Sequence, residues 1–102
     1  MTYRIRVSKQ AARQIRAAAD WWIENRPKAR LAFSEDLEEA FQVIRTFPSI
    51  GEPVPHGRLH GVRRVHLGRV HYHLYYLISS KAEMVEVLAL WHTSRGARPS
   101  LS

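Results

Sequence analysis

The sequence predicts an α+β fold of order β-α-α-β-β-β, in which a helical hairpin packs on a mainly antiparallel sheet. A short alternating segment comes first, two long amphipathic stretches follow it, and three strand patterns come last. Helices and strands that are grouped in this way are typical of α+β architecture. A chain of 102 residues with 45% hydrophobic content has enough apolar surface for one modest core. We therefore expect a single domain over residues 1–102.

The first half of the chain is predicted to form one strand and two helices. Apolar and polar residues alternate over residues 2–7, which is the period of a half-buried strand. Ser8 can cap the first free amides of a helix, and the helical spacing of apolar residues continues to about Asn25. Pro27 ends this helix and opens the next one, whose apolar stripe stops before Phe47. The short connection predicts a helical hairpin.

The second half is predicted to be a loop followed by three strands. Prolines and glycines recur over residues 49–61, so we expect an ordered loop without regular structure there. Strands are expected over residues 61–67, 69–78 and 84–91, with the second at the centre of the sheet. Beyond the last strand the chain presents His92 and Arg95 and ends in a tail that we expect to be flexible. Side chains at such an exit are held by a rigid scaffold and stay open to a partner.

Charge and composition indicate acidic partners and exclude several classes of protein. The chain has 16 Lys and Arg against 9 Asp and Glu, a formal charge of +7, and arginines predominate among its cations. Guanidinium groups suit bidentate pairing with carboxylate or phosphate. The chain has no cysteine, which excludes disulfides and thiolate chemistry. No apolar run approaches the roughly 20 residues of a membrane span, and the N-terminus does not resemble a signal peptide. We expect a cytoplasmic protein that does not bind membranes.

Basic side chains are predicted to gather on the open face of the sheet. Strand alternation turns them away from the apolar face that the helices cover. The residues placed there are Arg4, Arg6, Arg64, His66, His71 and His73. Such a surface can grip RNA phosphates, with histidines for proton transfer, or dock an acidic peptide. It can equally be a solvated basic face.

Two aromatic residues are candidates for contact with a partner. Tyr75 alternates with Tyr72 and Tyr76, which are expected in the core, so its ring is expected on the open face. Trp21 and Trp22 are adjacent in a helix and cannot face the same way. We expect one of this pair in the core and the other, Trp21, under a partner.

No metal site or cofactor is expected. The i, i+2 spacing of His71 and His73 places two imidazoles on one side of a strand, as in some metal sites. No nearby Asp, Glu or Cys completes a set of ligands. His56 and His60 are expected to be ordinary polar residues of the loop.

Four segments in this order resemble the RelE/ParE superfamily of bacterial toxins, and ParE most closely. They are residues 47–53, 61–64, 68–76, and 85–92 with Arg95. The resemblance spans nearly the whole chain. It implies the toxin of a type II toxin–antitoxin module, which a cognate antitoxin neutralises through an extended, acidic or amphipathic C-terminal segment. A toxin–antitoxin hetero-oligomer is then expected.

The resemblance to ParE implies inhibition of DNA gyrase by binding, without catalysis, through His92 and Arg95. Contacts with the antitoxin are expected from the exposed aromatic and basic side chains, namely Trp21, Arg4, Arg6, Arg64 and Tyr75. The alternative is a RelE-like endoribonuclease that cuts mRNA on the ribosome. Its candidate catalytic residues are Arg64, His71, His73 and His92, although no complete catalytic set aligns. A protein-interaction domain without toxicity is a third possibility.

Overall fold

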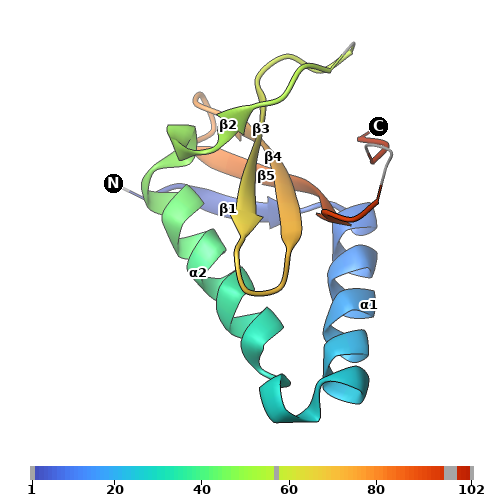
Figure 1. Ribbon diagram of the computed structural model, residues 1–102. Helices are drawn as coiled ribbons and strands as arrows, with labels where there is room; N and C mark the ends of the chain where they lie inside the picture. The colour runs from blue at the N-terminus through green and yellow to red at the C-terminus, as the bar shows by residue number, and fades with distance from the viewer. Residues whose placement is uncertain (1, 57, 96–98, 102) are drawn as a thin grey trace.

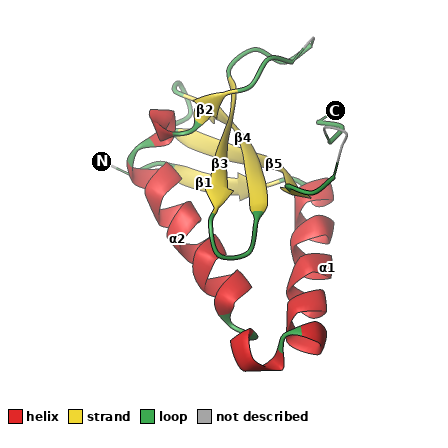
Figure 2. Ribbon diagram, in the orientation of Figure 1, coloured by secondary structure: helices red, strands yellow, loops and turns green. Residues whose placement is uncertain are grey.

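The computed structural model describes residues 2–56, 58–95 and 99–101, which form a helical hairpin on one face of a five-stranded sheet (Figures 1 and 2). The elements are β1 (Arg4–Val7), α1 (Lys9–Asn25), α2 (Ala32–Thr46), β2 (Glu52–Pro53), β3 (Val62–Leu67), β4 (Tyr72–Ser79) and β5 (Met84–His92), with 3₁₀ turns over Pro27–Ala29 and Pro48–Ile50. The predicted α+β class is confirmed. Neither helix in the described part of the chain is long and apolar enough to cross a membrane.

The strand order is β1-β5-β4-β3-β2, so β4 lies at the centre of the sheet as predicted. The strands β2 to β5 pair antiparallel with their neighbours, whereas β1 pairs parallel with β5. The register of β4 against β5 shifts between Tyr75 and Tyr76. Both of these tyrosines are buried, and they belong to different core clusters.

The N-terminal half follows the sequence prediction except at the second helix. Ser8 caps α1, and its Oγ accepts a hydrogen bond of 3.1 Å from the amide of Ala11. α1 ends at Asn25 as predicted, but α2 begins at Ala32 and not at Pro27. Arg26, the residue before the proline, has φ −134° and ψ 65°, which is outside the helical region. A 3₁₀ turn therefore reverses the chain before α2 can begin.

Side chains of α1 replace a missing strand along one edge of β5. β1 pairs only with residues 84–87 of β5. Beyond that point, the Leu90 amide donates to Gln14 Oε1 at 2.9 Å, and Ser8 Oγ and Gln10 Nε2 donate to the Leu88 carbonyl at 3.2 and 3.5 Å. An uncovered edge would invite pairing with another chain. These bonds also fix α1 against the end of β5.

Apolar side chains pack on both faces of the sheet. The main cluster lies between the helices and the sheet and includes Phe33, Ile44, Leu74 and Tyr76. A second cluster covers the opposite face, and its buried members are Val54, Val62, Tyr75, Leu88, Ala89 and Leu101. The face that we expected to be open is thus partly covered by the loop and the tail.

Two predictions for irregular segments need correction. The loop over residues 49–61 contains part of a 3₁₀ turn and the short strand β2, which pairs with β3. The tail is not free where it is described, because Leu101 is buried and Gln10 Nε2 donates to the Ser100 carbonyl at 2.5 Å. Residues 96–98 and 102 of the predicted flexible tail lie outside the described residues.

β4 begins at Tyr72, three residues later than predicted, because the preceding turn is tied to α2. Arg69 Nε donates to Asp36 Oδ1 at 2.9 Å, and the Arg69 amide donates to Asp36 Oδ2 at 3.0 Å. His71 has a positive φ of 62°, in the left-handed region that non-glycine residues rarely adopt. His71 and His73 therefore do not share a strand, contrary to the prediction, although the ring of His66 lies 6.1 Å from that of His71 and 5.3 Å from that of His73.

Candidate functional site

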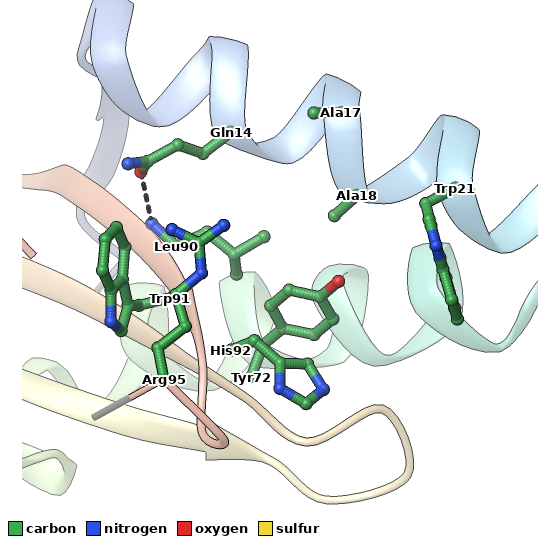
Figure 3. A pocket seen from close by; sticks show the side chains of 9 residues that line it. All are labelled: Gln14, Ala17, Ala18, Trp21, Tyr72, Leu90, Trp91, His92 and Arg95. Atoms are coloured by element: carbon green, nitrogen blue, oxygen red, sulfur yellow. Dashed lines mark hydrogen bonds between the residues drawn. The ribbon is translucent and has the colours of Figure 1, made fainter. Parts of the chain in front are cut away.

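A hollow of about 250 Å³ lies between α1 and the ends of β4 and β5, where the chain leaves the sheet (Figure 3). Its lining comprises Gln14, Ala17, Ala18, Trp21, Tyr72, Leu90, Trp91, His92 and Arg95. Small side chains from α1 face Tyr72 and Leu90, and Trp21 closes one end (Figure 3). The sequence prediction had named Trp21, His92 and Arg95 for two separate roles. The structure brings all three to one surface.

A second hollow of about 370 Å³ adjoins the first and shares Trp21, Tyr72 and His92 with it. Its other lining residues are Trp22, Arg26, Val70 and His71. We call the two hollows together the α1–β5 groove. Arginines and histidines line the groove, and no Asp or Glu is among its lining residues. Its apolar surface and basic charge suit a segment that carries both apolar and acidic side chains.

His92 is held in a defined orientation inside the groove. Its ring lies 4.9 Å from that of Tyr72, edge to face, and the two residues are paired across β4 and β5. The Ser94 amide donates to His92 Nδ1 at 3.1 Å. A neutral ring that accepts this bond carries its proton on Nε2. Burial raises the pKa of Tyr72, so its phenol stays uncharged at neutral pH.

Two guanidinium groups lie on indole rings along the α1–β5 groove. Arg95 Cζ is 4.3 Å from the centre of the Trp91 ring, and Arg26 Cζ is 5.1 Å from that of Trp21. Such cation–π contacts orient the guanidinium and leave its edges free to donate. The groove can therefore present donors to carboxylates at two places along its length.

On the opposite face of the sheet, a smaller basic cluster surrounds Arg64. Its Nε donates to Glu52 Oε1 at 2.5 Å and its Nη1 to the Tyr75 hydroxyl at 3.4 Å. The hydrogen bond lowers the pKa of Glu52 and raises that of Arg64. The rings of His66 and His73 are 5.3 Å apart. Burial, followed by the charges of Arg64 and His66, lowers the pKa of His73.

Several residues predicted for the open face are not available together. Tyr75 is only 2% exposed, because the second core cluster covers it, so a partner cannot contact most of its ring. Arg4 and Arg6 lie on β1, at the other edge of the sheet, and Arg6 forms an ion pair of 3.7 Å with Glu86. They do not join Arg64. The predicted basic face is thus divided.

The candidate nuclease residues are also divided. His92 is paired with Tyr72 and lies on the helix side of the sheet, where both line the α1–β5 groove. Arg64 and His73 lie on the other side with Tyr75, and His71 sits in the turn. Over the described residues, no group of three or more His, Cys, Asp or Glu side chains could hold a metal ion.

Sequence reasoning missed several residues of the groove. Gln14, Ala17, Ala18 and Arg26 were not singled out, although they line the same groove as Trp21. Gln14, Ala17, Ala18 and Trp21 are spaced as one face of a helix, which is a signal that could have found them. No local pattern in the sequence indicates that the guanidinium of Arg26 lies over the ring of Trp21.

A family model described as the ParE toxin of the type II toxin–antitoxin system, parDE, matches residues 5–96. No curated protein matches the chain significantly.

Solved toxin–antitoxin structures have a similar fold. A chain of the chromosomal ParDE system from P. aeruginosa has a TM-score of 0.69 at 17% identity and covers 91% of this chain and 98% of its own. A chain of the RelBE2 complex from Mycobacterium tuberculosis has a TM-score of 0.64 at 22% identity, over 90% and 99%. A chain of the intact RelBE complex from E. coli has a TM-score of 0.62 at 17% identity, over 91% and 99%. At these identities the likeness concerns the fold alone.

Proposed function

Since the chain belongs to the ParE toxin family of type II toxin–antitoxin systems, we propose that it acts in the cytoplasm by binding and inhibiting DNA gyrase. A cognate antitoxin neutralises it in a hetero-oligomeric complex. The observation that carries the proposal is the α1–β5 groove, which presents His92 and Arg95 from the end of β5. Both side chains are oriented by aromatic neighbours. A rigidly presented surface suits inhibition by binding.

The candidate catalytic residues lie on opposite faces of the sheet, and this separation supports inhibition by binding over catalysis. General acid–base cleavage of RNA needs an acid, a base and a phosphate clamp within reach of one phosphodiester. Here Arg64 and His73 lie on the face of the sheet opposite His92. Arg64 is moreover occupied by Glu52. His92 therefore cannot act together with Arg64 and His73 on one phosphodiester.

The antitoxin can neutralise the toxin by covering the α1–β5 groove, which also carries the residues assigned to the target. Trp21, our candidate for antitoxin contact, lines the same groove as His92 and Arg95. An antitoxin segment with an apolar anchor and flanking carboxylates would bury Trp21 and pair with Arg26 and Arg95. It would then cover the residues assigned to the target. The solved neighbours from M. tuberculosis and E. coli are toxin–antitoxin complexes, which supports an antitoxin partner.

A gyrase supercoiling assay tests the proposal when it is run beside in-vitro translation with the same purified protein. We expect inhibition of supercoiling with translation unaffected. Arg95→Ala should lose the inhibition, whereas Arg13→Ala should keep it, because Arg13 is an exposed arginine of α1 outside the groove. Normal supercoiling in the presence of folded wild-type protein would disprove gyrase as the target.

The second candidate function is a ribosome-dependent endoribonuclease. The observation that favours it is the adjacency of Arg64, His66 and His73 on one face of the sheet. Cleavage of mRNA on programmed ribosomes, lost in Arg64→Ala and kept in Arg95→Ala, would establish this function in place of gyrase inhibition. Absence of cleavage by the folded wild-type protein would exclude this function, and cleavage that Arg64→Ala retains would place the catalytic residues elsewhere.

A further inference from the structure

Acidic side chains on this basic chain are concentrated at the start of α2. The four are Glu35, Asp36, Glu38 and Glu39, out of nine acidic residues in a chain of charge +7. Asp36 and Glu39 line a hollow of about 270 Å³ between α2 and β3. The other lining residues are Ala40, Val43, Ile50, Val65, His66, Leu67 and Gly68. We call this hollow the α2–β3 groove. It shares no lining residue with the α1–β5 groove.

The α2–β3 groove has an apolar wall that is open to solvent. Ile50 is 58% exposed, and Phe47 next to this segment is 63% exposed. Val43 and Val65 are half-buried beside Ile50. Exposed large apolar side chains that line a hollow indicate a site of contact with a partner.

The backbone of β3 is unpaired at this groove. β2 pairs only with Arg63 and Arg64, so no described strand lies beside residues 65–67 on that side. The Val62 carbonyl accepts from the Val54 amide at 2.8 Å, which fixes the side toward which alternate residues of β3 point. By this alternation the N–H and C=O of His66 point outward, away from β4. An extended segment can pair with them by strand addition.

The carboxylates select the charge of that segment. Asp36 already pairs with Arg69 at 2.9 Å, whereas Glu39 has no ion pair with another described residue. Every second side chain of an extended segment turns to the same face. Those that turn toward α2 can place apolar groups on Val43, Ile50 and Val65. A cationic side chain on that same face then lies against Glu39 and Asp36, where an acidic one would be repelled.

We propose that the α2–β3 groove binds an extended protein segment, paired with the backbone of His66, whose side chains facing α2 include both apolar and basic ones. The site is separate from the basic groove and goes beyond the proposed function. The protein then has two grooves of opposite preference, one for acidic and one for basic segments. Two different partner segments can occupy them at once.

The test uses two labelled synthetic peptides of equal length with threonine at every second position. Valine and arginine alternate at the remaining positions of one peptide, and valine and glutamate alternate at those of the other. Fluorescence anisotropy at physiological ionic strength should give an affinity about tenfold higher for the arginine peptide. Glu39→Arg should weaken its binding by about tenfold. The control is Glu24→Arg, which makes the same change in net charge on an exposed residue of α1 outside the groove, and it should retain the wild-type affinity.

A second measurement on the wild type does not depend on the folding of variants. Binding of the arginine peptide should slow the hydrogen exchange of the His66 amide, and N-methylation of alternate peptide amides should abolish that protection. Equal affinity of Glu39→Arg and wild type, preference for the glutamate peptide, or unchanged exchange at His66 on saturation would each overturn the proposal. None of these outcomes involves gyrase, so they are independent of the proposed function.

Discussion

The guanidinium of Arg95 lies 4.3 Å from the centre of the Trp91 ring. Trp91 belongs to β5, is paired with His73 and packs against the second core cluster. The side chain of Arg95, which follows the end of β5, is thus fixed by Trp91, which lies within that strand. This contact sets where a positive charge stands along the α1–β5 groove.

We expect Arg95→Lys to retain part of the toxicity and Arg95→Ala to lose it. Lysine keeps the charge, but it lacks the planar fork that stacks on indole and donates to a carboxylate in two places. Arg95 is exposed, so both variants should unfold within about 0.5 kcal/mol of wild type. Growth arrest on induction and urea unfolding are the two measurements. Equal toxicity of all three proteins would contradict a role for Arg95.

Trp21→Ala should weaken the complex with the antitoxin by about tenfold or more, since exposed aromatic residues in grooves are frequent binding hot spots. Trp21 is 43% exposed and packs edge to face on Trp22. The matched control is Ile23→Ala, because Ile23 is 56% exposed on the same helix and does not line the groove. Isothermal titration with the purified antitoxin measures both. A larger loss for Ile23→Ala would place the contact elsewhere on α1.

Local patterns in the sequence predicted β1, α1, β3 and β5 well, because each has a regular period and a clear end. Ser8 and Pro27 are such ends, and both act as predicted at the first helix. The alternation around Val70 continues that of β4, however, so nothing local shows that β4 begins only at Tyr72. The turn there is held by Arg69 on Asp36, which is 33 residues away in the sequence. Long-range ion pairs of this kind cannot be read from periodicity.

The candidate site was only partly predictable for the same reason. The exit of the last strand correctly indicated where His92 and Arg95 lie, at the end of β5. The burial of Tyr75 depends on Val54 and Leu101, which come from a loop and from the tail. Segments without a periodic pattern gave no sign that they would cover the sheet. Strand alternation correctly predicted on which face of the sheet Tyr75 lies, but it did not predict that Tyr75 is buried there.

Tyr76→Phe should destabilise the protein by about 1–3 kcal/mol, the usual cost of leaving buried polar groups without a partner. The Tyr76 hydroxyl donates to the Pro48 carbonyl at 2.6 Å and accepts from the Gly51 amide at 2.9 Å. Burial raises the pKa of Tyr76, which keeps the proton available for donation. Urea unfolding measures the change. Tyr3→Phe, at the rim of the main cluster, is the control and should lie closer to wild type.

Gly51→Ala should destabilise the protein by about 1–3 kcal/mol, as overpacking of an interior commonly does. A Cβ on Gly51 would lie 2.5 Å from the Tyr76 hydroxyl oxygen and 2.9 Å from the Arg64 carbonyl oxygen. Gly68→Ala is the matched control, because nothing lies within 4 Å of a Cβ at that position. Thermal unfolding of the two variants should separate them clearly. A Gly51→Ala protein as stable as Gly68→Ala would show that the packing around Tyr76 is looser than the structure indicates.

Stability should fall as the pH drops below about 6.5, and His73 should cause part of that fall. Burial and the nearby cations Arg64 and His66 lower the pKa of His73 from its ordinary 6.5. The folded protein then binds this proton more weakly than the unfolded chain does, so protonation favours unfolding. The contribution is fully present above pH 6.5 and is lost as the pH falls toward the lowered pKa of the folded state.

The pKa of Glu52 is lowered from 4.5 by Arg64, so its contribution has the same sign but disappears at lower pH. Urea unfolding of wild type and His73→Asn between about pH 5.5 and 7.5 therefore isolates the histidine. The variant should lose less stability than wild type across that range, and an equal loss in both proteins would rule out His73 as the titrating group.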